Sequence, residues 1–188
     1  PDTYADVLGD QAGGDHRWRI EHAQVVHRDD LPRFASLKVI ASMQPTHATS
    51  DMPWAEARVG RERLYGAYAW QRLRALGVPL ALGSDFPVES VDPRLGLYSA
   101  VTRQDRDGKP PGGWLPDQKL SPEQALQGFT AGAAFASFDE ESTGRLAPGF
   151  SADFVVLDAD PLSVDASRLP SLQVRSTWVD GRRVYAAE

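Results

Sequence analysis

Three short apolar runs separated by helix-like stretches constrain the fold of this sequence more than any other feature. Val25 and Val26 close the first run, residues 18–26, and the other two runs span residues 39–43 and 78–82. Between the last two runs, apolar positions from Gly60 to Leu76 follow helical spacing before Gly77. Strand, helix, strand, helix, strand at this rhythm predicts an α/β fold built from βα units around a parallel sheet.

The second half of the chain changes character. The stretch Ser121-Pro122-Glu123-Gln124 has the residues of a capping box with proline at the first helical position, and predicts a helix to about Ala131. Further on, apolar runs at 154–157 and 174–179 precede Asp180-Gly181, a strong hairpin signal. We therefore expect residues 143–188 to form a small β unit appended to the α/β region.

Composition excludes several classes of protein. The 188 residues carry 20 Lys and Arg against 26 Asp and Glu, a formal net charge of −6, so no basic surface dominates and nucleic acid is not an expected partner. An Arg-rich stretch at residues 58–74 leaves nucleic-acid binding as a minor alternative, although a solvated helix is its default interpretation. The chain has no cysteine, which leaves His and carboxylate side chains as its strong metal ligands.

No apolar run approaches the roughly 20 residues that a membrane-spanning helix needs, and no signal-peptide pattern is present. We expect a soluble protein, cytoplasmic or periplasmic, with no membrane partner. Because the chain begins at Pro1, a targeting segment upstream would not be visible.

Polar side chains with metal-binding capacity follow each of the three predicted strands. The strand predicted within residues 18–26 ends near His22, His47 follows the second strand in a stretch whose Pro45 and Thr46 suit a loop, and Asp85 follows the third. The carboxyl ends of strands in a (β/α) barrel converge on one mouth, so these three side chains are expected to meet there. An imidazole and a carboxylate suit zinc, and a carboxylate beside a metal-activated water suits a general base.

Each of these residues also has a structural interpretation. A lone histidine at a strand end is commonly a hydrogen-bonded structural residue, and Gly83-Ser84-Asp85 before Phe86-Pro87 is also an ordinary turn with an Asx cap. The other two histidines, His16 and His27, lie in charged stretches and are expected at the surface. The occurrence of all three candidates at successive strand ends favours the metal site.

Four motifs in order resemble the amidohydrolase superfamily, and most closely amidohydrolase family 3, which includes enzymes similar to N-substituted formamide deformylase. The motifs cover most of the chain and are Arg19-Ile20-Glu21-His22-Ala23-Gln24, Gln44-Pro45-Thr46-His47, Gly83-Ser84-Asp85-Phe86-Pro87-Val88 and the segment from Gly144 to Leu157. Each motif is weak alone, and their order makes the set specific.

The resemblance implies the C-terminal part, about strands 6–8, of a TIM-like (β/α)₈ barrel in residues 1–142, with part of a small β-sandwich in residues 143–188. It implies that His22 binds a metal at the end of the sixth strand, and that Asp85 ends the eighth as both metal ligand and general base. His47, at the end of the seventh, is expected to contact the substrate. The implied cofactor is Zn²⁺ or another divalent metal in the intact enzyme.

The resemblance also identifies what the sequence lacks. Members carry a His-x-His pair on the first strand, often a carboxylated Lys or a Glu on the fourth, and a His on the fifth, and none of these segments is present. The implied function is that of a fragment of a metal-dependent amidohydrolase, which hydrolyses the C–N bond of a small amide-like molecule and is completed by the N-terminal part of the same protein. We expect the isolated chain to bind zinc weakly and to lack activity. The rival interpretation is a non-catalytic binding or scaffold module derived from a barrel.

Overall fold

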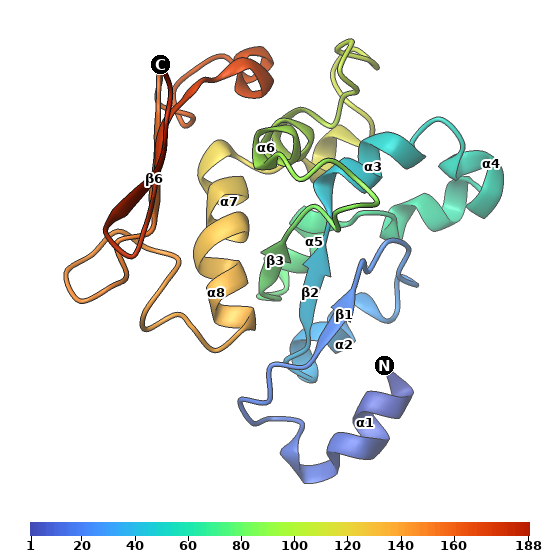
Figure 1. The fold of residues 1–188 in the computed structure, drawn as a ribbon. Coiled ribbons are helices and arrows are strands. Elements are labelled where there is room, and N and C mark those ends of the chain that lie inside the picture. Colours follow the sequence, from blue (N-terminus) through green and yellow to red (C-terminus); the bar gives the residue numbers. More distant parts are fainter.

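Six strands form two separate three-stranded sheets in the computed structural model, which describes residues 1–188 (Figure 1). The strands are β1 (Arg19–Glu21), β2 (Ile40–Met43), β3 (Leu80–Leu82), β4 (Phe154–Leu157), β5 (Val174–Val179) and β6 (Arg182–Ala186). The α-helices are α1 (Asp2–Leu8), α2 (Leu31–Ser36), α3 (Pro45–Asp51), α4 (Ala55–Val59), α5 (Trp70–Ala75), α6 (Pro93–Thr102), α7 (Pro122–Gln127) and α8 (Ala133–Ala136). Short 3₁₀ turns are η1 (Gly9–Gln11), η2 (Arg61–Gly66), η3 (Pro116–Gln118) and η5 (Ala166–Ser171), and η4 (Gly128–Gly132) is a π-helical turn.

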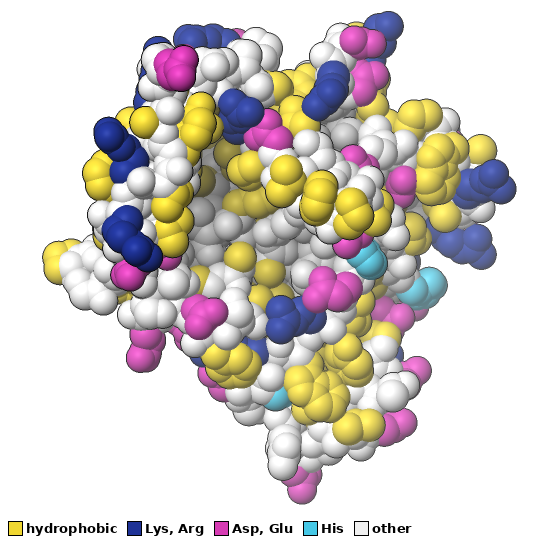
Figure 2. Space-filling model, viewed as in Figure 1, with side chains coloured by type: hydrophobic (Ala, Val, Ile, Leu, Met, Phe, Trp, Pro, Cys, Tyr) yellow, Lys and Arg dark blue, Asp and Glu magenta, His cyan; other side chains and the backbone are white.

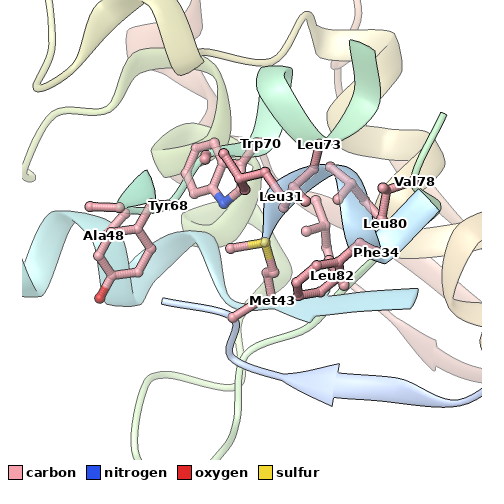
Figure 3. Packing of buried hydrophobic residues seen from close by; sticks show 14 of the residues in the cluster. Leu31, Phe34, Met43, Ala48, Tyr68, Trp70, Leu73, Val78, Leu80 and Leu82 are labelled. Atoms are coloured by element: carbon pink, nitrogen blue, oxygen red, sulfur yellow. The ribbon is translucent and has the colours of Figure 1, made fainter. Parts of the chain in front are cut away.

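The first sheet is parallel, with strand order β1-β2-β3, so the predicted βα units are confirmed. All three strands therefore end at the same edge of the sheet, which is the edge where His22, His47 and Asp85 follow them. Met43, Leu80 and Leu82 belong to the main hydrophobic cluster, together with residues of α2 and α5 (Figure 3). Helices α2 and α5 thus cover one face of the sheet.

The prediction of one continuous helix from Gly60 to Leu76 is wrong, because the chain forms η2 and α5 with an interruption between them. At the interruption, Ala67 makes an isolated antiparallel bridge with Val25, and the Tyr68 backbone N–H donates to the Gln24 carbonyl at 2.8 Å. These bonds join the segment to the loop after β1, and Tyr68 takes a positive φ of 47° to make them. Long-range pairing therefore overrides the helical spacing.

The stretch around His47 is helical, which corrects the expected loop. Pro45 ends β2 as predicted, and it is also the first residue of α3. Proline at that position is compatible with a helix, because its missing N–H would have no intrahelical partner there. His47 consequently lies in the first turn of α3, where its side chain is buried.

Helix α6, which packs against α3 and α7, was not predicted although its sequence carries a start signal. The Asp92 side chain accepts a hydrogen bond from the Arg94 backbone N–H at 3.0 Å, and Pro93 is the first helical residue of α6.

No helix in the structure is both long enough and apolar enough to cross a membrane.

The capping box at Ser121 and Gln124 is confirmed by hydrogen bonds in both directions. The helix it starts continues beyond the expected Ala131, through η4 to Ala136. A Cβ at Gly128 would meet the Leu82 side chain and one at Gly132 would meet the Leu80 carbonyl, so glycine at these positions lets the helix approach β3 closely.

The second sheet is antiparallel, with order β4-β5-β6, and confirms the predicted hairpin. Asp180 and Gly181 have φ values of 50° and 71°, as a tight primed turn requires. Several hydrophobic side chains of this sheet are exposed, among them Val155, Val179 and Val184. On the face of the molecule shown in Figure 2, acidic and basic side chains are interspersed with hydrophobic ones. Tyr98 of α6 packs against Leu169 and Leu172 in a separate buried cluster, which attaches the C-terminal segment to the part of the chain that carries the first sheet.

Candidate metal centre

Three side chains meet at the carboxyl edge of the first sheet. His22 follows β1, His47 lies on α3 directly after β2, and Asp85 follows β3. One ligand atom from each residue lies within 4.8 Å of the others. The structure therefore brings together the three residues that the sequence singled out, although 25 or more positions separate neighbours along the chain.

The backbone at two of these residues is left-handed. His22 has φ 68° and Asp85 has φ 58°. Residues other than glycine adopt this backbone region at a cost of roughly 1–3 kcal/mol. Such conformations persist where the surrounding structure enforces them, and they occur frequently at functional sites. Here the conformation turns the chain sharply at the strand ends.

His22 is oriented by Gln44, a residue of the second motif for which the sequence predicted no role. The Nδ1 atom of His22 lies 2.9 Å from the Oε1 atom of Gln44, whose residue is 7% exposed. With the amide oxygen accepting, Nδ1 carries the imidazole proton and Nε2 keeps its lone pair for a cation. The sequence signal for this role was the position of Gln44, directly after the predicted second strand and three residues before His47.

His47 is buried, and neither of its ring nitrogens has a hydrogen-bond partner. Its Nε2 atom lies 3.7 Å from Asp85 Oδ2, and its ring stacks on that of His22 with centroids 5.5 Å apart. A buried polar atom without a partner costs about 1–3 kcal/mol, so such atoms commonly await a ligand, an ion or water. The unpaired imidazole is the observation that best fits a cation or substrate at this place.

Asp85 is more accessible, with a side chain 36% exposed. Its carbonyl accepts from the Val88 backbone N–H at 2.8 Å, and Ser84 Oγ accepts from the Phe86 N–H at 3.3 Å. The segment is therefore a turn, as the structural interpretation predicted, but Ser84 and not Asp85 supplies its side-chain cap. The Asp85 carboxylate itself accepts no hydrogen bond within this turn. It is therefore available to bind a cation.

The imidazole and carboxylate groups of the cluster are donors that suit a zinc ion. Zinc binds imidazole nitrogen and carboxylate oxygen at about 2.0–2.2 Å in a tetrahedral arrangement, which places two ligand atoms roughly 3.4 Å apart. The 3.7 Å between His47 and Asp85 is close to that spacing. Across the whole cluster the ligand atoms lie within 4.8 Å of one another.

The other two histidines lie outside the cluster. His27 is exposed, as expected. His16 is half-buried, which corrects the surface assignment: its Nε2 lies 2.8 Å from the Leu37 carbonyl and its Nδ1 accepts from the Trp18 N–H at 3.0 Å. Both nitrogens of His16 are thus occupied by the backbone, and the residue has a structural role.

Comparison with known proteins identifies the family of the chain. The model of the amidohydrolase family matches residues 1–185. A putative amidohydrolase, YtcJ of Bacillus subtilis, is 36% identical over 167 residues, which are 89% of this chain and 32% of the relative. The N-substituted formamide deformylase of Arthrobacter pascens is 29% identical over 184 residues, which are 96% of this chain and 33% of that enzyme.

The crystal structure of an uncharacterized metal-dependent hydrolase from Pyrococcus horikoshii OT3 superimposes with a TM-score of 0.75 at 36% identity, covering 88% of this chain and 33% of that one. The chain belongs to the amidohydrolase family and has the general fold of its members. It spans about a third of the length of the relatives that it matches.

Proposed function

We propose that this chain is the C-terminal part of a metal-dependent amidohydrolase that hydrolyses the C–N bond of a small amide-like molecule. The observation that carries the proposal is the cluster of His22, His47 and Asp85 at one edge of the parallel sheet. Similarity to YtcJ and to N-substituted formamide deformylase supports the reaction class.

In this proposal, β1, β2 and β3 are the sixth, seventh and eighth strands of a (β/α)₈ barrel, and residues 1–142 are the barrel segment. Residues 143–188 belong to a small β-sandwich, whose remaining strands would cover the apolar residues exposed on the tail sheet. β1 and β3 each have one neighbour in their sheet, so each offers a free edge. The N-terminal part of the same protein would pair with those edges.

His22 and Asp85 would hold a divalent cation, and Zn²⁺ suits their nitrogen and oxygen donors best. When bound, the metal supplies a Lewis acid that lowers the pKa of water to roughly 7. His22 would hold the metal through Nε2, since Nδ1 is engaged by the Gln44 side chain. The missing N-terminal segments would supply the remaining ligands.

Asp85 would act as the general base and then the general acid. Its carboxylate takes a proton from the attacking water as the new C–O bond forms at the carbonyl carbon. The same proton passes to the leaving nitrogen as the C–N bond breaks, and an acid and an amine are released. His47 would hydrogen-bond the substrate, for which its two unpaired ring nitrogens leave it available.

The test uses the full-length protein with matched alanine variants. We expect purified wild type to contain stoichiometric divalent metal and to hydrolyse members of a panel of N-substituted formamides and simple amides, with activity lost to a chelator and restored by Zn²⁺. His22→Ala should lose metal, whereas His47→Ala should keep it and lose kcat/KM. Metal loss in both variants would make His47 a third ligand.

A non-catalytic scaffold is the alternative from a different class. It predicts a full-length protein whose partner binding does not change when a chelator removes metal. Metal-free protein that hydrolyses nothing in the panel, before or after addition of Zn²⁺, would overturn the enzyme proposal in favour of this one.

A further inference from the structure

A second polar cluster lies beside the three candidate ligands and joins the two segments that carry the histidines. Asp51 Oδ2 accepts hydrogen bonds from Gln24 Nε2 at 3.1 Å and from the Tyr68 hydroxyl. Gln24 Nε2 also lies 2.9 Å from the Tyr68 hydroxyl, so the three side chains close a triangle. None of the three was given a role by the sequence.

The location of each member gives the triangle its significance. Gln24 lies two residues after His22, on the loop that leaves β1. Asp51 lies four residues after His47 in α3, and residues four apart share one face of a helix. The bond from Gln24 to Asp51 is therefore a direct link between the loop of one imidazole and the helix of the other.

Tyr68 anchors the link to the rest of the molecule. Its ring is buried and packs edge-on against Trp114 at 5.8 Å. Its backbone N–H donates to the Gln24 carbonyl at 2.8 Å, and its own carbonyl accepts from Arg103 Nη1 at 3.1 Å. Burial, followed by the bond to Asp51, raises the pKa of Tyr68 well above its ordinary value, so the hydroxyl keeps the proton that it donates.

We propose that Asp51 is a positioning residue, which with Gln24 and Tyr68 fixes the His22 loop against α3 and so sets the separation of the two imidazoles for metal binding. The inference rests on the proposed metal site and extends it to residues that touch neither metal nor substrate. Outer groups that orient metal ligands typically change metal affinity by 10–100-fold when they are removed.

The test measures Co²⁺ binding to the full-length protein by its visible absorption, which reports the geometry of the bound ion. Asp51→Ala should weaken Co²⁺ binding by about 10–100-fold and alter the spectrum of the bound ion. Asp51→Asn keeps one oxygen able to accept both hydrogen bonds, and should bind Co²⁺ within about threefold of wild type. Rescue by this conservative variant distinguishes positioning from a need for charge at the site.

A matched control is available at Asp117, a carboxylate that also accepts from two side chains, Arg72 and Gln118, but joins α5 to η3. Asp117→Asn should leave Co²⁺ affinity and the spectrum unchanged. If Asp51→Ala does not fold, Tyr68→Phe removes a single oxygen while keeping the packed ring, and should weaken Co²⁺ binding in the same direction.

The outcomes separate this inference from the function on which it rests. Wild-type protein that binds no Co²⁺ would overturn both. Wild-type binding that depends on His22 and Asp85, together with unchanged affinity and spectrum in folded Asp51→Ala and Tyr68→Phe, would overturn the positioning role alone.

Discussion

The Nδ1 atom of His22 is hydrogen bonded at 2.9 Å to the side-chain amide of Gln44, which itself is buried. The two residues come from different strands, since His22 follows β1 and Gln44 follows β2. Because the parallel strands β1 and β2 end at the same edge, the Gln44 side chain after β2 reaches the imidazole ring of His22 after β1. The contact decides which imidazole nitrogen is free to bind a cation.

Replacement of Gln44 should therefore alter metal affinity without removing a ligand. Gln44→Glu preserves an acceptor for Nδ1–H and adds negative charge, so zinc affinity should be retained or increased. Gln44→Leu removes the acceptor and should lower zinc affinity by about 10–100-fold. Competition with a chromophoric chelator measures both values in the full-length protein. Equal affinities for the two variants would contradict the tautomer argument.

Asp85→Asn should abolish nearly all turnover by the full-length enzyme, because a carboxamide cannot take the proton from water. Loss of a general base commonly costs about 10²–10⁴-fold in kcat, and the lost carboxylate would also weaken metal binding. Substrate binding should largely survive, as equilibrium titration would measure. Ser84→Ala, which changes the same turn without touching the carboxylate, is the control. A near-normal kcat for Asp85→Asn would exclude this residue as the base.

The sequence allowed the parallel sheet and the meeting of the three side chains to be predicted, because both follow from where apolar runs end. It did not predict the triangle of Gln24, Asp51 and Tyr68. That triangle depends on the interruption between η2 and α5, where a bridge to Val25 replaces a helical turn. Long-range pairing of this kind leaves no periodic signal in one sequence, whereas the missed α6 had an ordinary start signal at Asp92-Pro93.

Asp92 also predicts a pH dependence of stability. The Arg94 guanidinium hydrogen bonded to its carboxylate lowers the pKa of Asp92 below its usual 3.8. A carboxylate whose pKa is lower in the folded state stabilises the fold fully above pH 3.8 or so, and this contribution is lost as the pH falls through the folded-state pKa. Asp92→Asn keeps an oxygen for the helix cap and removes the charge. Urea unfolding should show a stability difference from wild type that is constant near neutral pH and shrinks below about pH 4. A difference that does not change with pH would contradict this account.

Arg103 is the structural support that links the interrupted segment to the rest of the core. Its guanidinium stacks 4.3 Å from the Trp70 ring and donates to the carbonyls of Trp114 and Tyr68, at 2.6 and 3.1 Å. Burial lowers its pKa to about 9, which leaves it charged at neutral pH. Arg103→Met keeps the aliphatic stem but leaves the carbonyls of Tyr68, which is buried, and Trp114, which is partly buried, without this donor. Each loss costs about 1–3 kcal/mol at most, offset in part by removal of a desolvated charge. We expect a net destabilisation of about 2 kcal/mol by urea unfolding. Arg106→Met, at an exposed position with no hydrogen bond or ion pair, should stay within about 0.5 kcal/mol of wild type. Equal stability of the two variants would show that Arg103 contributes no more than an ordinary surface arginine.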